Sequence, residues 1–250
     1  MDLFEICKEA LLEARNAALE LENTVTDNRH NIQTSADLNA EKRIIDVLKK
    51  HGVSCTLHSE ELDEPIKMGD GQYDIVVDPI DGSFFFLHGI KTFTSVAMSV
   101  LEKGKVKYSF VQSVADLDLY HCDENAAYLN GKQIVCDTNA PEPYLITGYA
   151  ARREQGDIAG KLATLPSEYY FLNDGGPKLA AMVAANQIDA AMEFKPTRFN
   201  EFAGALIAQK AGAFVETIDG KPLVIDPLAR QSLIVARSEK LLRELQQVLA

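Results

Sequence analysis

The chain has 250 residues, of which 46% are hydrophobic, enough to bury a sizeable core in one large domain or two small ones. Its 25 Lys and Arg against 37 Asp and Glu give a formal net charge of −12, the wrong sign for gripping a nucleic-acid backbone through counterion release. We therefore expect small-molecule or metal-ion ligands and no nucleic-acid partner. No apolar run is long enough to span a membrane, and the acidic N-terminus is unlike a signal peptide, so we expect no membrane partner and a cytoplasmic location.

Two amphipathic helices open the chain. Apolar residues recur at helical intervals over residues 1–23, which predicts a first helix. A polar loop follows, and a second helix with Ile44, Val47 and Leu48 on its buried stripe is expected to start near Thr34 and to stop at Gly52. Both helices are expected to cover one face of a sheet.

The next segment is rich in strands. Residues 73–78 form a continuous apolar run typical of a central strand, residues 92–114 predict two strands around a Lys-Gly-Lys turn, and residues 117–134 predict a further hairpin. Prolines and turn residues in 136–143 mark the best internal boundary, which divides the chain into 1–138 and 139–250. Beyond it, strand-like and helix-like segments alternate as in an α/β layer, and a final helix begins after Ser238.

The stretch VVDPIDGS ends the predicted central strand with oxygen ligands. One turn can aim the carboxylates of Asp78 and Asp81 and the carbonyl of Ile80 at the same point, which suits a hard cation such as Mg²⁺. Gly82 and Ser83 then start a short helix, whose backbone N–H groups and hydroxyl can hold a phosphate. The alternative is a plain Asp/Pro/Gly turn, which is the better explanation of such a pentapeptide on its own.

Two further acidic pairs lie near this motif in the sequence. Glu60 and Glu61 follow another predicted strand and can join the same sheet edge, or they are part of a solvated loop. Asp37 and Glu41 share one face of the second helix, where surface charges are the commoner explanation. Either acidic pair becomes a stronger candidate for the metal site only if all three acidic groups point to the same site.

Five sequence segments, taken in order along the chain, support a shared site for these acidic groups. The segments TSADLNAEKRII, HSEEL, VVDPIDGS, AAYLNGKQI and FNEFAGALIAQKAGAFVETIDGKPL resemble, in order and spacing, the inositol monophosphatase family of Mg²⁺-dependent sugar and inositol phosphatases, which includes archaeal-type fructose-bisphosphatases. The resemblance covers nearly the whole chain. It implies an α/β (α+β) fold, a layered αβαβα sandwich of mixed sheets covered by helices, and a homodimer.

The resemblance also assigns roles to individual residues. It implies Mg²⁺ ligands at five positions: Glu60, Asp78, the carbonyl of Ile80, Asp81 and Asn200. Ser83 would position the attacking water, so that the expected catalytic residues are Glu60, Asp81 and Ser83. Gly82 and Ser83 would contact phosphate, Glu193 would bind substrate hydroxyls, and Asp37 would lie in the outer shell of the metal site.

The chain departs from the family pattern at two places. The family's second motif normally carries Asp where this chain has Asn200; an amide oxygen still coordinates Mg²⁺ but adds no charge, so weaker metal binding is expected. Glu201 is expected to point about 100° away from Asn200 on a helix and not to compensate. Phe85 replaces a family amide in Ser83-Phe84-Phe85-Phe86, and we expect all three phenylalanines to anchor the turn against the core.

These observations favour metal-assisted hydrolysis of a small phosphate monoester, an inositol monophosphate or a sugar phosphate such as fructose 1,6-bisphosphate. Lys195 and Arg198 could meet a second phosphate, as could the Tyr149–Arg153 segment, although a solvated basic loop explains them equally well. Two alternatives remain: a phosphatase for phosphoadenosine phosphate, and a catalytically weakened homologue that binds a phosphorylated ligand.

Overall fold

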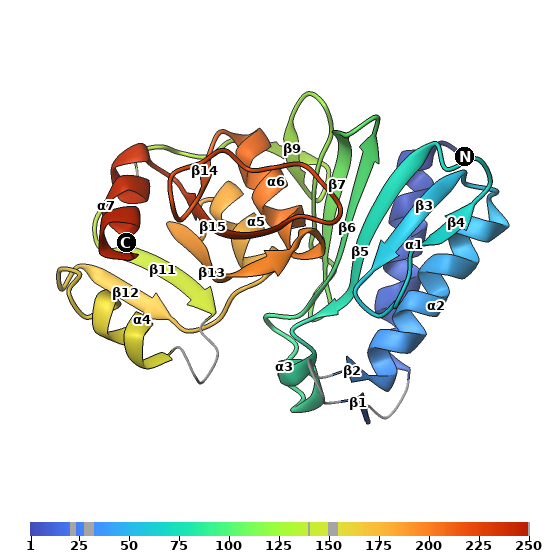
Figure 1. The fold of residues 1–250 in the computed structure, drawn as a ribbon, viewed down its shortest axis with the longest axis horizontal. Helices are drawn as coiled ribbons and strands as arrows, with labels where there is room; N and C mark the ends of the chain where they lie inside the picture. Colours follow the sequence, from blue (N-terminus) through green and yellow to red (C-terminus); the bar gives the residue numbers. More distant parts are fainter. Residues whose placement is uncertain (21–23, 28–32, 140, 150–154, 250) are drawn as a thin grey trace.

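The computed structural model describes residues 1–20, 24–27, 33–139, 141–149 and 155–249, apart from the side chains at positions 26, 27, 155, 156 and 200. Within these residues, helical layers alternate with an eight-stranded and a five-stranded sheet (Figure 1), which confirms the layered αβαβα sandwich expected from the sequence. The helices are α1 (Leu3–Leu19), α2 (Ser35–Lys50), α3 (Ser83–Leu87), α4 (Gln155–Leu162), α5 (Pro177–Ala184), α6 (Ala203–Ala211), α7 (Glu239–Leu249) and the 3-10 helix η1 (Phe199–Phe202).

The outer layer of the first half is the helix pair α1 and α2, as predicted. Asp2 caps α1 by accepting a hydrogen bond from the Glu5 amide at 2.9 Å. Thr34 and Asp37 form a capping box at the start of α2, so the expected cap is confirmed. The apolar stripes of both helices pack on one face of the eight-stranded sheet, where they form a continuous buried core.

The eight-stranded sheet carries the predicted central strand in its interior. Ile75 and Val77 face α1 and α2, whereas Val76 faces α5 and α6, so this strand is apolar throughout because both of its faces are covered. Residues 117–134 form three strands, so the prediction of a single hairpin was wrong. In spatial order the strands are β10 (Lys132–Ile134), β9 (Ala127–Leu129), β8 (Leu119–Cys122), β7 (Lys105–Ser113), β6 (Ser95–Glu102), β5 (Tyr73–Asp81), β3 (Cys55–Ser59) and β4 (Ile66–Met68).

The middle layer, α5 and α6, belongs to the second half of the chain but packs on the first sheet. Ser109 of β7 donates a hydrogen bond to the Ala203 carbonyl of α6 at 3.1 Å. The two helices approach so closely that a Cβ on Gly204 would lie 1.9 Å from the Pro177 carbonyl oxygen. Only glycine fits there, and this contact holds the start of α5 near η1.

The second sheet completes the sandwich. In spatial order its strands are β12 (Tyr169–Leu172), β11 (Tyr144–Tyr149), β13 (Ala190–Arg198), β15 (Arg230–Ala236) and β14 (Phe214–Thr217). Helices α4 and α7 cover its outer face, and Ser238 caps α7 as predicted by accepting from the Leu241 amide at 3.2 Å. The elements α4, β12 and β15 were not predicted. A short pair, β1 (Val25–Asp27) and β2 (Gln33–Thr34), lies near α3.

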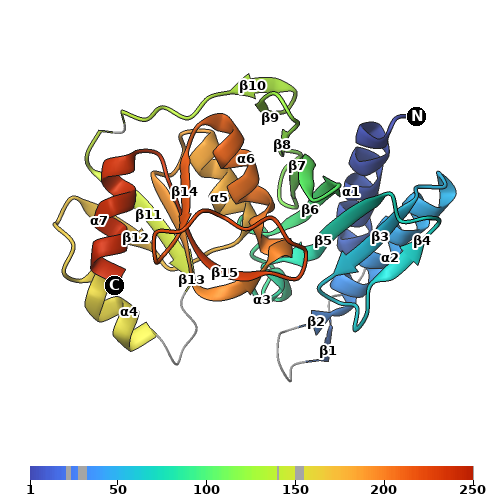
Figure 2. The ribbon, with the colours of Figure 1, turned by 45° about the horizontal axis from the view of Figure 1, so that its top comes forward.

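The chain crosses from the first sheet to the second between β10 and β11, over the expected boundary (Figure 2). The division into 1–138 and 139–250 stays a prediction, because α5 and α6 are shared packing partners of both sheets. Among the described helices, none has the length and apolar character that crossing a membrane requires.

Candidate active site

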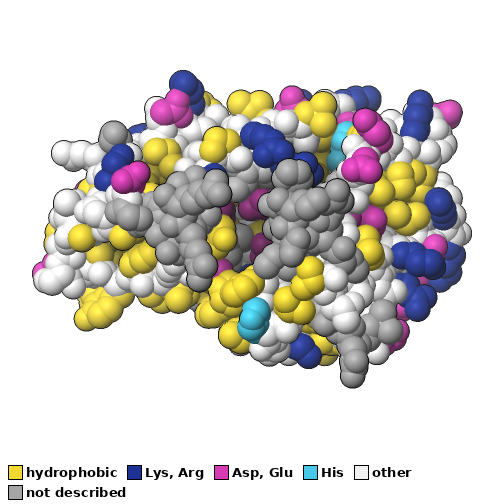
Figure 3. Space-filling model, turned by 60° about the horizontal axis from the view of Figure 1, so that its bottom comes forward, with side chains coloured by type: hydrophobic (Ala, Val, Ile, Leu, Met, Phe, Trp, Pro, Cys, Tyr) yellow, Lys and Arg dark blue, Asp and Glu magenta, His cyan; other side chains and the backbone are white. Residues whose placement is uncertain are grey.

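The predicted residues gather where β5 ends, α3 begins and the N-terminus of α5 approaches from the second half (Figure 1). Figure 3 views this end of the molecule and shows acidic side chains at the bottom of a hollow. Both halves contribute carboxylates here, since the charges of Asp174 and Glu193 from the second half act on Asp81 of the first.

The turn after β5 is shaped by a bulge. Asp78 and Asp81 are three residues apart, a spacing that would place their side chains on opposite faces of a regular strand. The pairing with β6 shifts between them, because Asp78 pairs with Ala97 whereas Asp81 pairs with Ser95. The extra residue turns the Asp81 side chain back toward the side that carries Asp78.

Ser83 ties this turn to α2. Its hydroxyl oxygen lies 2.6 Å from Asp37 Oδ1 and 2.7 Å from the Ile80 carbonyl oxygen, two acceptors around a single hydroxyl hydrogen. Asp37 is almost fully buried, and burial raises the pKa of its carboxyl. Its second oxygen accepts from the Thr34 amide at 2.7 Å. Asp37 therefore contacts the predicted catalytic hydroxyl directly.

The carboxylates of the turn repel one another. Burial, and then the neighbouring charges of Glu60 and Asp81, raise the pKa of Asp78 well above its usual range. Burial, and then Asp174 and Glu193, raise the pKa of Asp81 in the same way. Glu60 follows β3, the strand that pairs with β5, and its charge acts on Asp78 from there. Buried like charges of this kind are stable only with protons or a cation between them.

The second half places two carboxylates beside the start of α5. Glu193 accepts a hydrogen bond from the Gly176 amide at 2.8 Å, and Asp174 accepts from the Gly175 amide at 2.9 Å. Burial raises the pKa of Glu193 to about 7 and that of Asp174 to about 6. A Cβ on Gly176, whose φ is +98°, would lie 2.5 Å from Asp81 Oδ2, so glycine is needed for this contact between the halves.

Two members of the cluster were not found from the sequence. Asp174 is 6% exposed and its Oδ2 has no partner among the described residues; an acid directly before Gly-Gly-Pro at a helix start was the available signal. Burial and the charges of Glu193, Glu60 and Asp81 raise the pKa of Glu201, which places it among these carboxylates. Its direction relative to Asn200 stays a prediction, because the side chain of Asn200 lies outside the described residues.

Comparisons with known proteins identify the type of site. The model of the inositol monophosphatase family matches residues 1–250. The chain belongs to this family. It is 29% identical over 221 residues to the fructose-1,6-bisphosphatase/inositol-1-monophosphatase of Archaeoglobus fulgidus, covering 83% of this chain and 79% of that protein. It is 25% identical to a putative Nus factor SuhB of Neisseria meningitidis, covering 94% and 91% of the two chains.

A solved structure shares the fold. The inositol monophosphatase of Thermotoga maritima superposes with a TM-score of 0.83 at 21% identity, covering 100% of this chain and 97% of that one. Inositol monophosphatase family members are metal-dependent phosphatases, so the expected enzyme class, a metal-dependent phosphoric monoester hydrolase, is confirmed.

The donor set has the chemistry of a hard-cation site. The clustered acidic side chains offer carboxylate oxygens, which suit Mg²⁺ and similar ions, and burial, followed by their mutual repulsion, raises their pKa values. Within the described residues, no three His, Cys, Asp or Glu side chains already lie in metal-binding geometry. The carboxylates thus surround a shared space without converging on one point, and the residues fit a cation in charge and donor type.

The remaining predicted residues lie around this space. Lys195 is half-buried on β13, and Arg198 at the end of that strand donates to the Glu60 carbonyl oxygen at 3.4 Å. The side chain of Asn200 and residues 150–153 of the Tyr149–Arg153 segment lie outside the described part of the structure. The roles of the predicted site residues stay a prediction, here and at the described positions.

Three phenylalanines were expected to anchor the turn against the core, but only one of them, Phe86, is buried there. Phe86 is buried, Phe85 is half-buried against Phe93, and Phe84 is 52% exposed, with ring centroids 4.5 Å from His88 and 5.7 Å from Phe85. A helix of five residues turns successive side chains to different sides, so a run of three cannot face the core together.

Proposed function

We propose that the protein hydrolyses a small phosphate monoester, an inositol monophosphate or a sugar phosphate such as fructose 1,6-bisphosphate, with Mg²⁺. The observation that carries this proposal is the cluster of buried carboxylates from both halves around the Asp78–Ser83 turn. A site with so much unbalanced charge is suited to holding cations that in turn hold a phosphate.

Glu60, Asp78, Asp81, the Ile80 carbonyl and Asn200 are the groups that would hold Mg²⁺. When bound, the metal supplies polarisation of the phosphoryl oxygens and a water of lowered pKa. Asn200 is the neutral member of this set, so the chain offers one charge fewer than the family pattern. Glu201 and Asp174 restore negative charge to the same space from other backbone positions.

Ser83 positions the attacking water in this proposal. Its hydroxyl hydrogen is donated to Asp37 Oδ1 at 2.6 Å or to the Ile80 carbonyl oxygen at 2.7 Å, and in either case its oxygen is left to accept a hydrogen bond from that water. The backbone amides of Gly82 and Ser83 face the phosphate at the start of α3. Glu193 binds substrate hydroxyls, and Lys195 and Arg198 are the nearest candidates for the second phosphate of a bisphosphate.

Two alternatives to this function remain. The first is a weakened homologue that only binds a phosphorylated ligand, which Asn200 and Phe85 favour. The relatives named as Nus factors lead us to withdraw the firm expectation of no nucleic-acid partner, although the charge of −12 still argues against backbone contacts. The second alternative is a phosphatase whose substrate is phosphoadenosine phosphate.

The proposed phosphatase is also expected to be a homodimer with a cytoplasmic location.

The test is phosphate release from inositol monophosphate, fructose 1,6-bisphosphate and phosphoadenosine phosphate, with Mg²⁺ titrated through the millimolar range. We expect metal-dependent turnover of the first or second compound. Turnover of phosphoadenosine phosphate alone would reassign the substrate. No turnover in the wild type, together with strong turnover in Asn200→Asp, would favour the weakened homologue.

A further inference from the structure

A buried carboxylate lies in the turn between β12 and α5. Asp174 is 6% exposed, and its Oδ1 accepts a hydrogen bond from the Gly175 amide at 2.9 Å. Its Oδ2 is buried and has no hydrogen-bond partner among the described residues. The backbone here is fixed, because the Asp174 amide donates to the Leu172 carbonyl oxygen at 2.9 Å and the Thr147 hydroxyl donates to the Asp174 carbonyl oxygen. A buried carboxylate oxygen without a partner is unfavourable, so a ligand that supplies a donor would stabilise it.

Carboxylates occupy the backbone amides that lead into α5. Free N–H groups at helix N-termini are a common place for a phosphate to bind. Pro177, in the first turn of α5, has no N–H, and the amides of Gly175 and Gly176 precede it. Asp174 accepts from the first of these amides and Glu193 from the second, at 2.9 and 2.8 Å. A second phosphate on a substrate would therefore meet two carboxylates here and not two free amides.

These two carboxylates border the space proposed for the metal and the reacting phosphate. A Cβ on Gly175 would lie 3.0 Å from Glu193 Oε1, so the turn that carries Asp174 packs closely on Glu193. The charges of Asp174 and Glu193 both act on Asp81 of the catalytic turn. A substrate whose phosphate lies near Asp81 would therefore place its remaining groups within reach of both carboxylates.

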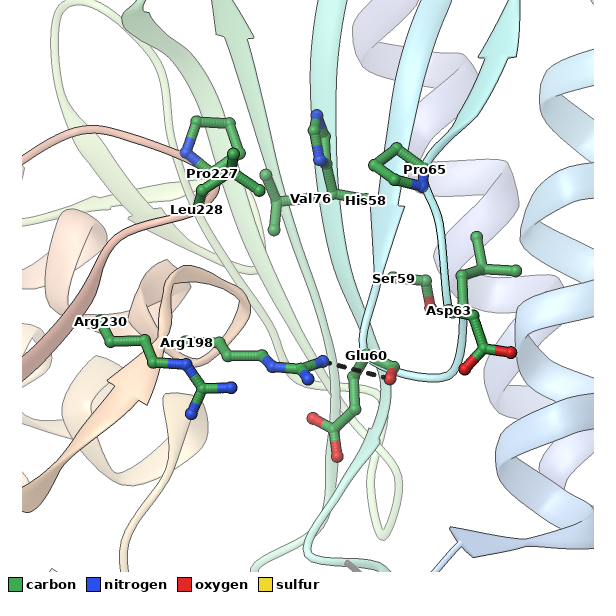
Figure 4. A pocket seen from close by; sticks show the side chains of 11 residues that line it. His58, Ser59, Glu60, Asp63, Pro65, Val76, Arg198, Pro227, Leu228 and Arg230 are labelled. Carbon is green, nitrogen blue, oxygen red and sulfur yellow. Dashed lines mark hydrogen bonds between the residues drawn. The ribbon is translucent and has the colours of Figure 1, made fainter. Parts of the chain in front are cut away.

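The basic side chain that acts on this cluster is directed to the first half. Figure 4 shows Arg198 reaching the loop of Glu60, whose carbonyl oxygen accepts its hydrogen bond at 3.4 Å. Its positive charge acts on Glu201. Within the described residues, the groups that lower the pKa values of Asp174 and Glu193 are backbone amides and not Lys or Arg side chains. The side of the site formed by Asp174 and Glu193 therefore keeps its negative charge.

We propose that Asp174 is a specificity-determining residue, which accepts a hydrogen bond from a substrate hydroxyl group beside Glu193 and repels a substrate that carries a second phosphate. This inference rests on the proposed function, because it names the substrate class of the same reaction. The substrate is a monophosphate of a polyhydroxylated compound such as inositol, in preference to fructose 1,6-bisphosphate. A hydroxyl hydrogen satisfies Oδ2, whereas a phosphate dianion has no hydrogen to donate and adds like charge.

Two compounds without an ester bond test the repulsion directly: butylphosphonate and butane-1,4-bisphosphonate, which differ by one anionic group and are not hydrolysed. Their dissociation constants are measured by calorimetry with Mg²⁺ at pH 8, for the wild type and Asp174→Asn. Asparagine has the same size as aspartate, and its Oδ1 can keep the hydrogen bond from the Gly175 amide. We expect the substitution to tighten binding of the bisphosphonate at least about tenfold and to change binding of the monophosphonate less than about twofold.

Turnover tests the same residue in the reaction. In Asp174→Asn, kcat/KM should fall for inositol monophosphate, which loses a charged acceptor for its hydroxyl group, and rise for fructose 1,6-bisphosphate, so that their ratio drops at least about tenfold. A residue needed only for folding would lower both values. Asp174→Glu, which keeps the charge, should keep the preference for the monophosphate. Asp157→Asn is the matched control, since Asp157 is exposed on α4, and it should behave like the wild type.

Four results would overturn the proposal: equal changes for the two phosphonates, no change for either, no phosphonate binding by the wild type, or a change confined to Mg²⁺ affinity. The last would assign Asp174 to the metal and not to the substrate. Failure of the proposed function is seen separately, as absence of phosphate release by the wild type. The phosphonate measurement still tests Asp174 in that case, because it needs no hydrolysis.

Discussion

The two halves of the molecule deliver carboxylates to the same hollow in different ways. In the first half, Asp78 and Asp81 belong to one short segment, and a bulge in β5 aims them. In the second half, Asp174, Glu193 and Glu201 come from three separate elements, and the first two are held by backbone amides at the start of α5. The first half thus carries a contiguous motif, whereas the second half supplies charge through its tertiary structure.

The largest effect is expected where the halves meet. Asp81 faces Asp174 and Glu193 and packs on Gly176, so Asp81→Asn removes the charge that both halves share. We expect phosphate release to fall about 1,000-fold or more, as when a main electrostatic group is removed from an active site. Asp70→Asn, at an exposed turn of the same half, should retain activity. Similar rates for the two variants would contradict the assignment.

Ser83→Ala tests the first half alone. It removes the hydroxyl between Asp37 and the Ile80 carbonyl while leaving the carboxylates in place. We expect kcat to fall about 100-fold, a typical loss for a group that positions a transferred proton, with little change in the Mg²⁺ concentration at half-maximal rate. A change confined to that Mg²⁺ concentration would make Ser83 a part of the metal site instead.

Asn200→Asp tests the second half, because it introduces the carboxylate that the family pattern has at this position. We expect Mg²⁺ to bind about tenfold more tightly, because the charge of the ligand set is one of the factors that determine affinity for hard cations. The measurement is the Mg²⁺ dependence of phosphate release. An unchanged dependence would mean that Asp174 and Glu201 already supply the charge needed.

Glu193→Gln should affect stability in a pH-dependent way. The pKa of Glu193 is raised to about 7, so in metal-free protein its ionised form costs stability above pH 7, and the cost disappears as pH falls toward its unfolded pKa of about 4.3. The variant should therefore melt a few degrees higher than the wild type at pH 8 and at the same temperature at pH 4. Glu124→Gln, on an exposed turn, should show no such gap; a gap equal at both pH values would indicate packing and not charge.

The contrast between the halves explains what the sequence could predict. Asp78, Asp81 and Ser83 could be proposed from the sequence because the roles predicted for them depend on a few adjacent residues. Asp174 and Glu201 were missed because their positions depend on how α5 and η1 pack against the end of β5. The three strands in residues 117–134 were predicted as a single hairpin, because three-residue strands such as β9 and β10 are too short to show a recognisable periodicity. The exposed Phe84 shows that composition alone does not determine the direction of a side chain.

Carboxylates from both halves are proposed to form one cation-binding centre. The most direct test is to measure the Mg²⁺ affinity of Glu201→Gln by calorimetry and to compare it with those of the wild type and of Glu124→Gln. Glu201 was not expected to take part from the sequence, and its charge reaches Asp81 and Glu60 only through the fold. We predict saturable Mg²⁺ binding in the wild type, at least about threefold weaker binding in Glu201→Gln, and no change in Glu124→Gln. Equal affinity in Glu201→Gln and the wild type, or no Mg²⁺ binding by the wild type, would contradict it.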